Sequence, residues 1–297
     1  MRLFAAFALI LSLMPSAALA QPAEKIKALP DCAALAASIS ELVVGPDTSI
    51  EDVEGGCHAS NVAFAVSNYV HYTIEEVTLR GPDLLHAYPA GDILPAADLS
   101  IKGMRIAPQT GSPLQDYITG LMAMVMDLHL VYETDPEALT STVSFDFKTD
   151  RLGSLFLTAS LSDFDNTDME SVDRGEINGR LNQLALKLDD RGLFATVFAP
   201  MVLGLLPFDE DPRPRIGVIK ADILAMLDMM PNRSLSDESR QALATYIDAF
   251  PKPEGNWSFD VISPDGLVLA DFAGNWAGLA DALADTVIVA VRDPAEP

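Results

Sequence analysis

The stretch TSTVSFDFKTDRLGSLFLTASLSD, from Thr140 to Asp163, decides the fold. Its first half places polar residues between three apolar positions, Val143, Phe145 and Phe147. After a short polar connection that ends at Gly153, the pattern resumes at Leu155, Leu157, Ala159 and Leu161. Strict alternation is typical of a strand with one side buried and the other in water. Two such strands with a short connection predict an antiparallel hairpin.

Segments on both sides of this hairpin repeat the alternation and predict further strands of the same sheet. Their apolar positions are Val70, Tyr72 and Ile74; Leu99 and Ile101, with a shift after Gly103; Leu184, Leu186 and Leu188; Trp257, Phe259 and Val261; and Val287, Val289 and Val291. We also expect Gly266–Ala270 to pair back onto the segment that precedes it, across a turn at Ser263–Gly266.

Helical patterns occupy other parts of the chain. Asp31 suits the N-cap of a helix over Asp31–Leu42, and a second helix is expected over Ser112–Met126. Helical spacing dominates from Gly192 to Phe250, and a short helix is expected over Trp276–Ala284. Because strands come in runs and most helices come in one run, the sequence predicts an α+β fold. We expect a large curved antiparallel sheet with helices packed on its apolar face.

The N-terminus has the pattern of a secretory signal peptide over residues 1–20. Arg2 precedes an apolar run over Leu3–Met14, and Ala18-Leu19-Ala20 is a small-x-small cleavage signature before Gln21. The apolar run is shorter than the roughly 20 residues that a membrane span needs. The sequence therefore predicts an exported chain, cleaved before Gln21, in a bacterial periplasm.

The mature chain is expected to form a single α+β domain over 21–297, with a helix-rich insertion at about 192–250. The most apolar later segment, Leu193–Phe208, contains Pro200 and lies between charged residues. We interpret it as a buried core helix rather than a membrane span.

The charge of the chain excludes two classes of partner. The sequence contains 19 basic and 43 acidic residues, a net charge of -24. Nucleic-acid binding depends on basic groups that neutralise phosphate, and anionic lipid attracts basic segments. We expect neither partner.

Two cysteines, Cys32 and Cys57, are present. In an oxidising compartment, and without a metal-type CxxC motif, they predict a disulfide. Redox catalysis is the less favoured alternative, because such cysteines usually sit closer in sequence.

Ser162–Glu176, SDFDNTDMESVDRGE, holds six carboxylates. Counted from Asp163, an EF-hand loop would need Gly at the sixth position and Glu at the twelfth, where this chain has Asp168 and Arg174. A looser calcium site of Asp163, Asp165 and Asp168 is the functional hypothesis. We favour a solvated loop that binds no ion.

Other catalytic patterns are absent from the sequence, including the Gly-x-Ser-x-Gly elbow and phosphate-binding loops. The four histidines, His58, His71, His86 and His129, show no zinc-type spacing. The adjacent carboxylates Glu75 and Glu76 fit an exposed strand better than general acid–base chemistry. We expect no cofactor and favour a protein without catalytic activity.

Methionines recur in the helical regions and supply the remaining candidate site. Methionine suits adaptable apolar surfaces, so an apolar ligand groove is one hypothesis; an ordinary core is the favoured one. The residues concerned are Met122, Met126, Met226 and Met230.

Two stretches carry a family resemblance. NQLALKLDDRGLFATVFAPM (Asn182–Met201) runs from a strand into an apolar helix, and PEGNWSFDVISPDGLVLADF (Pro253–Phe272) precedes a final valine strand. Over about Gly179–Val291 this resembles uncharacterised proteobacterial periplasmic families, akin to the AsmA-like and YdgA-like extended-sheet envelope proteins. The resemblance implies an envelope protein with a long apolar trough and supplies no catalytic residues.

These observations favour a non-enzymatic, soluble periplasmic envelope protein that binds a lipid, another apolar ligand or a protein partner. The alternative is a periplasmic hydrolase with dispersed acidic residues, for example Glu75 and Asp163. The sequence leaves the oligomeric state open.

Overall fold

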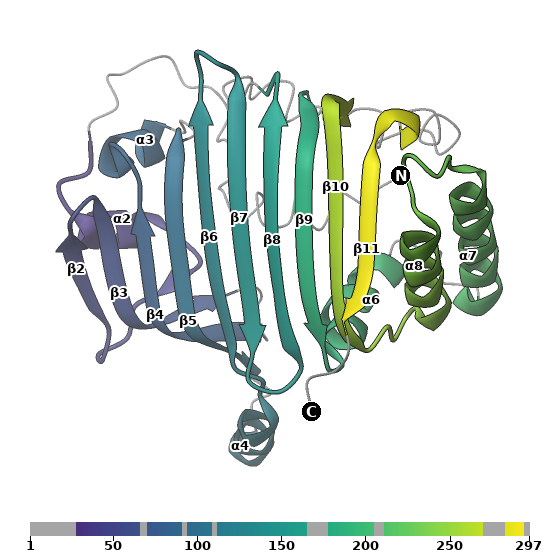
Figure 1. Cartoon of the computed structure of the whole chain (residues 1–297). Coiled ribbons are helices and arrows are strands. Elements are labelled where there is room, and N and C mark those ends of the chain that lie inside the picture. The colour runs from purple at the N-terminus through teal and green to yellow at the C-terminus, as the bar shows by residue number, and fades with distance from the viewer. Residues whose placement is uncertain are drawn as a thin grey trace. The chain divides into compact units, whose positions relative to one another are not determined.

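The computed structural model describes residues 28–65, 70–90, 94–108, 112–164, 178–204, 211–269 and 283–293 (Figure 1). The predicted signal peptide, residues 1–20, lies outside these ranges. The strands are β1 (Leu42–Val43), β2 (Ser49–Val53), β3 (Gly56–Ala65), β4 (Val70–Arg80), β5 (Ala96–Pro108), β6 (Met126–Asp135), β7 (Thr140–Thr149), β8 (Gly153–Ser162), β9 (Arg180–Asp190), β10 (Gly255–Val268) and β11 (Val287–Asp293).

The helices are α2 (Cys32–Ser38), α3 (Leu84–Ala90), α4 (Pro113–Met122), the π-helical turn η1 (Phe194–Phe198), α6 (Ala199–Leu203), α7 (Pro212–Met229), α8 (Asp237–Ala249) and the 3-10 turn η3 (Leu283–Asp285). The predicted helix over Trp276–Ala284 falls almost entirely outside the described residues.

The strands form an 11-stranded antiparallel sheet that does not close, in the order β1-β3-β4-β5-β6-β7-β8-β9-β10-β11, with β2 also paired to β3. The large antiparallel sheet and the α+β class are confirmed. The described residues divide into two compact units. Unit 2 holds those up to Thr134 together with Val143–Arg151, and unit 1 holds Asp135–Thr142 and those from Leu152 onward. A single domain over 21–297 stays a prediction.

In unit 2, the pairing of β3, β4 and β5 shows where the side-chain alternation shifts. Ala59, Val77 and Ile101 form one row of paired residues. Regular alternation would place the next residue on this side two or four positions away along each strand. Here it lies three positions away: Val62 and Ile74 are buried, and Met104 packs against them. Two successive residues therefore point away from this core on each strand. The shift that the sequence predicts after Gly103 is confirmed, and it extends across three strands.

Backbone conformation accommodates this shift. Asn61 and Gly103 have φ angles of 52° and 64°, in the left-handed region that glycine adopts without strain and asparagine tolerates. A Cβ at Gly103 would clash with the carboxyl group of Glu75. The Gly103 N–H donates to Asp127 Oδ1 at 2.8 Å, where the register between β5 and β6 also shifts.

The predicted helix over Ser112–Met126 is too long by four residues. α4 ends at Met122, and Met126 instead begins β6, where it pairs with Met104 and is buried. The Val125 N–H donates to Asp150 Oδ1, and the Val125 carbonyl accepts from the Asp150 N–H. Strand pairing and these two hydrogen bonds override the helical spacing of the sequence.

In unit 1, neighbouring strands place apolar residues opposite one another. Leu155, Leu188 and Trp257 form one row across β8, β9 and β10, and Leu157, Leu186 and Phe259 form the next. A core cluster of Leu227, Met230, Leu235, Leu267 and Leu283 packs against residues of α7, α8, β9, β10 and β11.

The predicted hairpin at Ser263–Gly266 is wrong. β10 is one strand from Gly255 to Val268, and both of its parts pair with β9. Ile262 pairs with Gln183, and Leu267 pairs with Leu181, so Ser263–Gly266 is an irregularity within the strand. Leu267 is buried in the core cluster, which explains why the chain returns to β9 instead of reversing.

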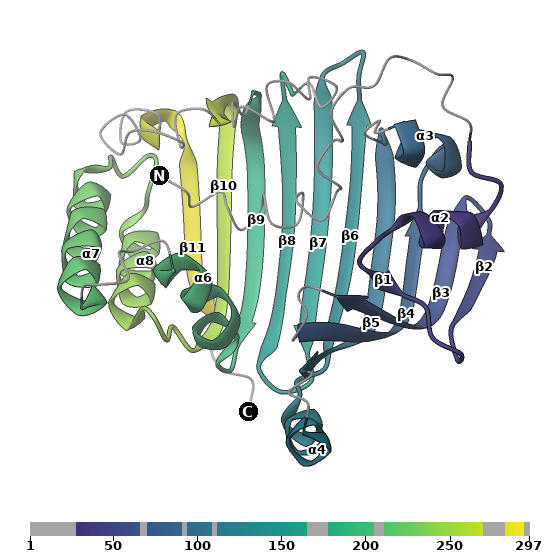
Figure 2. The ribbon, with the colours of Figure 1, turned by 180° about the vertical axis from the view of Figure 1, so that it is seen from behind.

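β11 lies at the end of the strand order, and α7 and α8 lie beside it in both views (Figure 1, Figure 2). Its Ile288 N–H donates to the Ser234 carbonyl at 2.7 Å, and its Ala290 N–H donates to Ser239 Oγ at 3.1 Å. Ser239 is 4% exposed and lies in the first turn of α8, which Ser236 caps. The hydroxyl of Ser239 thus satisfies a backbone donor of the last strand.

We expect Ser239→Ala to lower the free energy of unfolding by about 1–3 kcal/mol, because the Ala290 N–H would stay buried without an acceptor. Urea unfolding measures this. Thr245→Ala is the control: its exposed hydroxyl donates only to the Gln241 carbonyl of the same helix, so stability should stay nearly unchanged. Equal effects of the two substitutions would contradict the role assigned to Ser239.

Candidate functional site

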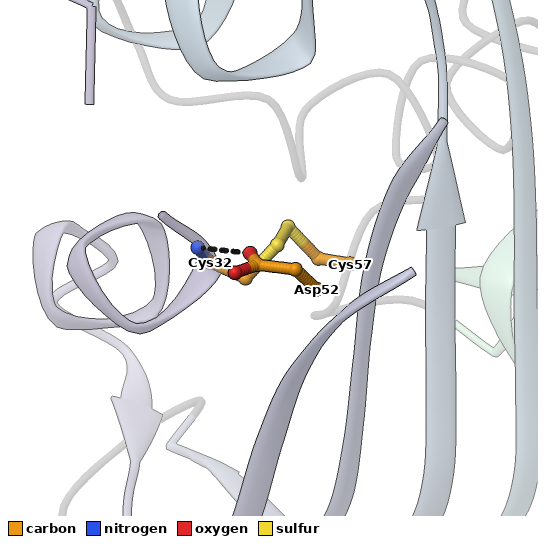
Figure 3. Close-up of side chains that lie close together, drawn as sticks. All are labelled: Cys32, Asp52 and Cys57. Atoms are coloured by element: carbon orange, nitrogen blue, oxygen red, sulfur yellow. Dashed lines mark hydrogen bonds between the residues drawn. A yellow bond between two sulfur atoms is a disulfide. The ribbon is translucent and has the colours of Figure 1, made fainter. Parts of the chain in front are cut away.

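The predicted disulfide is present. Cys32, the first residue of α2, is bonded to Cys57 of β3, with 5.5 Å between the Cα atoms. Asp31 Oδ1 accepts from the Ala34 N–H and caps the helix, as the sequence predicts. Asp52 Oδ1 accepts from the Cys32 N–H at 2.9 Å (Figure 3). The Asp52 carboxylate and the disulfide therefore fix the N-terminus of α2 on β2 and β3.

Cys32, Asp52 and Cys57 also bring three potential metal ligands within 4.8 Å of one another. Metal binding by cysteine requires the thiolate, and both sulfur atoms are used in the disulfide. Asp52 is exposed and already accepts a hydrogen bond. In its oxidised form this group is a structural link. Over the described ranges, no other group of three His, Cys, Asp or Glu residues comes as close.

The calcium hypothesis falls mostly outside the described residues, because Asp165 and Asp168 are not among them. Asp163 is described and has a φ angle of 53°. Its side chain is 71% exposed, and Oδ2 lies 3.2 Å from Arg180 Nε. The one described carboxylate of this set is therefore paired with a cation of the chain.

The methionine candidates lie in different places. Met226 and Met230 belong to or pack against the core cluster of unit 1, and Met126 is buried in β6 of unit 2. Met122 ends α4, and its side chain is outside the described residues. Met126, Met226 and Met230 thus have the environment of ordinary core residues.

The carboxylates and histidines of unit 2 do not converge. Glu75 pairs with Arg105 at 2.7 Å and Glu76 pairs with Lys102 at 3.3 Å, and all four side chains are at least 46% exposed. His129 Nε2 lies 2.9 Å from Asp98 Oδ1. His58 Nδ1 is hydrogen-bonded to Thr78 Oγ1. These are cross-strand pairs, exposed except for the part-buried His58–Thr78 pair.

A depression of about 340 Å³ lies at the alternation shift, and sequence reasoning missed it. It forms where small residues such as Ala63 and Gly103 leave the β3–β5 surface low, next to Glu75 and Arg105. The charged groups at its rim neutralise each other, and Asn61 donates to the Asp47 carbonyl. These contacts leave it with no evident chemistry of its own.

One carboxylate of unit 1 is deeply buried. Asp190, 2% exposed, accepts through Oδ1 from the N–H groups of Gly192 and Phe194, so it caps the turn into η1. Burial first, and then the negative charge of Asp190, raise the pKa of the Tyr246 hydroxyl well above its usual value. Tyr246 therefore stays neutral at physiological pH.

Tyr246 belongs to a closely packed group of aromatic rings. Its ring contacts Phe194, Trp257 and Phe259 edge-on, with centroids 5.1–5.9 Å apart. Trp257 is 2% exposed, donates to the Pro253 carbonyl and lies under the guanidinium of Arg292. This packing joins α8 and η1 to β10, and it makes Tyr246 a structural residue.

The feature that best resembles a binding surface is a set of apolar rows on β8 and β9. Residues directly opposite in adjacent strands lie on the same side of a sheet. Leu188 and Trp257 are buried at one end of the rows. Further along, five leucines on the same side remain partly exposed: Leu155, Leu157 and Leu161 of β8, and Leu184 and Leu186 of β9. We call these five residues the leucine rows.

Unit 2 has an equivalent arrangement. Leu79, Leu99 and Leu130 form one row across β4, β5 and β6, and Val77, Ile101 and Leu128 form the next. All six are partly exposed. α2 buries Cys32, Leu35 and Ala36 and contacts β2 and β3. Both views show α2 on one side of these strands (Figure 1, Figure 2).

Comparison with known proteins adds no relative. No family model matches the chain, and no match is found among curated proteins or solved structures. Within the described ranges, every helix is too short or too polar to cross a membrane. The function has to be argued from the residues themselves.

Removal of the disulfide should destabilise unit 2. The cysteines are 25 residues apart, and closing such a loop restricts the unfolded chain by about 3.5 kcal/mol in the entropic model. We expect Cys32→Ser/Cys57→Ser to lose a free energy of unfolding of about this size, measured by urea unfolding. Dithiothreitol should lower the stability of the unsubstituted protein by a similar amount and leave the stability of the double variant unchanged. A variant as stable as the unsubstituted protein would refute this.

Calcium should not change the melting temperature, because Asp163 is largely exposed and paired with Arg180. Differential scanning fluorimetry in calcium chloride and in chelator measures this. A higher melting temperature in calcium that disappears in Asp163→Asn would instead establish the ion site.

Proposed function

We propose that this chain is a non-enzymatic periplasmic protein that binds a lipid or another apolar ligand on one side of its sheet. The observation that carries the proposal is the leucine rows, five apolar side chains that share a side of β8 and β9 and remain partly exposed. Contiguous exposed apolar surface is commonly a binding site. Covering it would contribute roughly 25 cal/mol per Å² of apolar area removed from water.

The same proposal assigns a role to the helices. Under this proposal, the sheet is curved, and helices cover only part of its apolar face. The ring contacts of Tyr246 with Trp257 and Phe259 support cover by α8 at β10. The disulfide of Cys32 supports cover by α2 at β3. Within unit 1, a ligand would occupy the leucine rows, which remain partly exposed.

The chemistry of the rows favours an apolar ligand over a charged one. From Leu181 to Leu188, the β9 positions that face the same side are Leu181, Leu184, Leu186 and Leu188, and none of them is charged. Asp190 also faces this side at the end of the strand, but it is buried and caps η1. The opposite side carries Lys187, Gln183 and Asp260. An anionic or cationic group would lose its hydration on the leucine rows without finding a partner, whereas an alkyl chain would gain free energy by leaving water there.

Export rests on the signal-peptide pattern of the sequence and is supported by the disulfide, which is typical of oxidising compartments. The resemblance to AsmA-like and YdgA-like envelope proteins points the same way and rests on sequence alone. The hydrolase alternative is weaker, because Glu75 and Asp163 are exposed and ion-paired. General acid–base catalysis needs carboxylates placed within hydrogen-bond reach of one substrate, and none of the described contacts brings these two together.

The test is the lipid content of the protein after mild purification, measured by native mass spectrometry. We expect Leu157→Asn/Leu186→Asn to lose most of the bound lipid, because two directly paired amides would interrupt the leucine rows. Thr158→Asn/Ala185→Asn is the matched control. These two residues pair directly with each other on the same strands, are also partly exposed and face the other side. The control should keep its lipid.

A protein that carries no ligand and binds neither lipid nor hydrophobic dyes would refute the proposal. So would equal loss of lipid in the two double variants. A hydrolytic activity found in a broad substrate screen, and abolished by Glu75→Gln or Asp163→Asn, would favour the alternative.

A further inference from the structure

α4 presents three of its apolar residues to solvent instead of to the protein. Leu114, Tyr117 and Ile118 are 68%, 66% and 45% exposed. Their spacing of three and four residues places them on one side of the helix. Asp116 and Thr119 are less exposed than these three, and Gln115 is exposed as well. A helix that packs only on its own protein would direct these apolar side chains inward. The exposed apolar side of α4 is therefore available to a binding partner.

The helix is well formed and accessible. Ser112 caps it, Pro113 occupies its first turn, and the Thr119 hydroxyl donates to the Gln115 carbonyl. Both views show α4 beyond the ends of β5 and β6, the two strands that it connects (Figure 1, Figure 2). Its apolar residues can therefore meet a flat surface.

The size of this surface argues against a second copy of the chain or another protein. A helix of ten residues is about 15 Å long. Stable protein interfaces bury roughly 800 Å² on each partner, which is far more than three exposed side chains on such a helix supply. A lipid surface needs no matching groove, and short amphipathic helices bind it by inserting their apolar side.

The charge of the helix selects the kind of lipid. α4 contains no Lys or Arg, and its one charged residue is Asp116. The chain as a whole has a net charge of -24, so an anionic membrane would repel it. Tyr117 combines an apolar ring with a hydroxyl, which suits the boundary between headgroups and acyl chains.

We infer that α4 docks the protein reversibly on a zwitterionic lipid surface through Leu114, Tyr117 and Ile118. The inference rests on the proposed function, because a lipid binder has to collect or deliver its ligand at a membrane. It adds the place of contact and the preferred headgroup charge.

Flotation of the mature chain with vesicles tests the inference. We expect the protein to float with phosphatidylcholine vesicles and to bind less when phosphatidylglycerol is included. Leu114→Ser/Tyr117→Ser/Ile118→Ser should lower the vesicle-bound fraction roughly tenfold, since the apolar side is lost. Val218→Ser/Ile219→Ser on α7 is the matched control, because these residues are 60% and 40% exposed. It should float like the unsubstituted protein.

Circular dichroism verifies that the variants are folded, and the substituted positions are exposed, so we expect unchanged spectra. The inference is overturned if the unsubstituted protein does not float, or if the triple variant floats equally well. It is also overturned if phosphatidylglycerol strengthens binding. A dimer in light scattering that only the triple variant dissociates would assign the surface to a second copy instead.

The two proposals can fail separately. A protein that carries lipid but does not float would refute docking by α4 alone. A protein that floats through α4 but never contains lipid would refute the proposed function and leave the docking surface in place.

Discussion

Cross-strand register is the constraint on which this structure depends. Because side chains alternate along a strand, a slip of one residue would move every apolar side chain of that strand to the other side. In unit 1, the pairing of Leu157 with Leu186 and of Leu186 with Phe259 keeps the apolar rows together. In unit 2, the left-handed backbone at Asn61 and Gly103 accompanies a shift that three strands make in step, so that Val62 and Ile74 stay buried.

The part of the fold that depends on local alternation could be predicted from the sequence. The strands around Phe145, Leu157, Leu186 and Phe259 follow directly from period-two patterns, and Phe145 and Phe147 are buried as expected. Errors arose where distant contacts decide. α4 ends early because β6 pairs with β5 from Met126, and Ser263–Gly266 does not reverse the chain because Leu267 returns to β9. Neither contact has a local signal.

The candidate site shows the same division. The disulfide could be predicted because two cysteines in a chain with a signal-peptide pattern leave one pairing. The exposure of the leucine rows could not, because alternation shows which residues share a side and not how much of that side the helices cover. The outward orientation of α4 was also missed. Its spacing is that of any amphipathic helix, and the side that faces the body depends on packing that the sequence does not reveal.

The last strand has a consequence beyond the stability of one molecule. The N–H groups of Ile288 and Ala290 are occupied only because Ser234 and Ser239 of the same chain reach them. If α8 detached, β11 would become an uncovered edge strand that carries the exposed side chains of Val287, Val289 and Val291. An uncovered edge strand is a template for pairing with another chain. Local opening of α8 would thus turn the chain into a seed for intermolecular β-sheet growth, at a rate that rises with protein concentration.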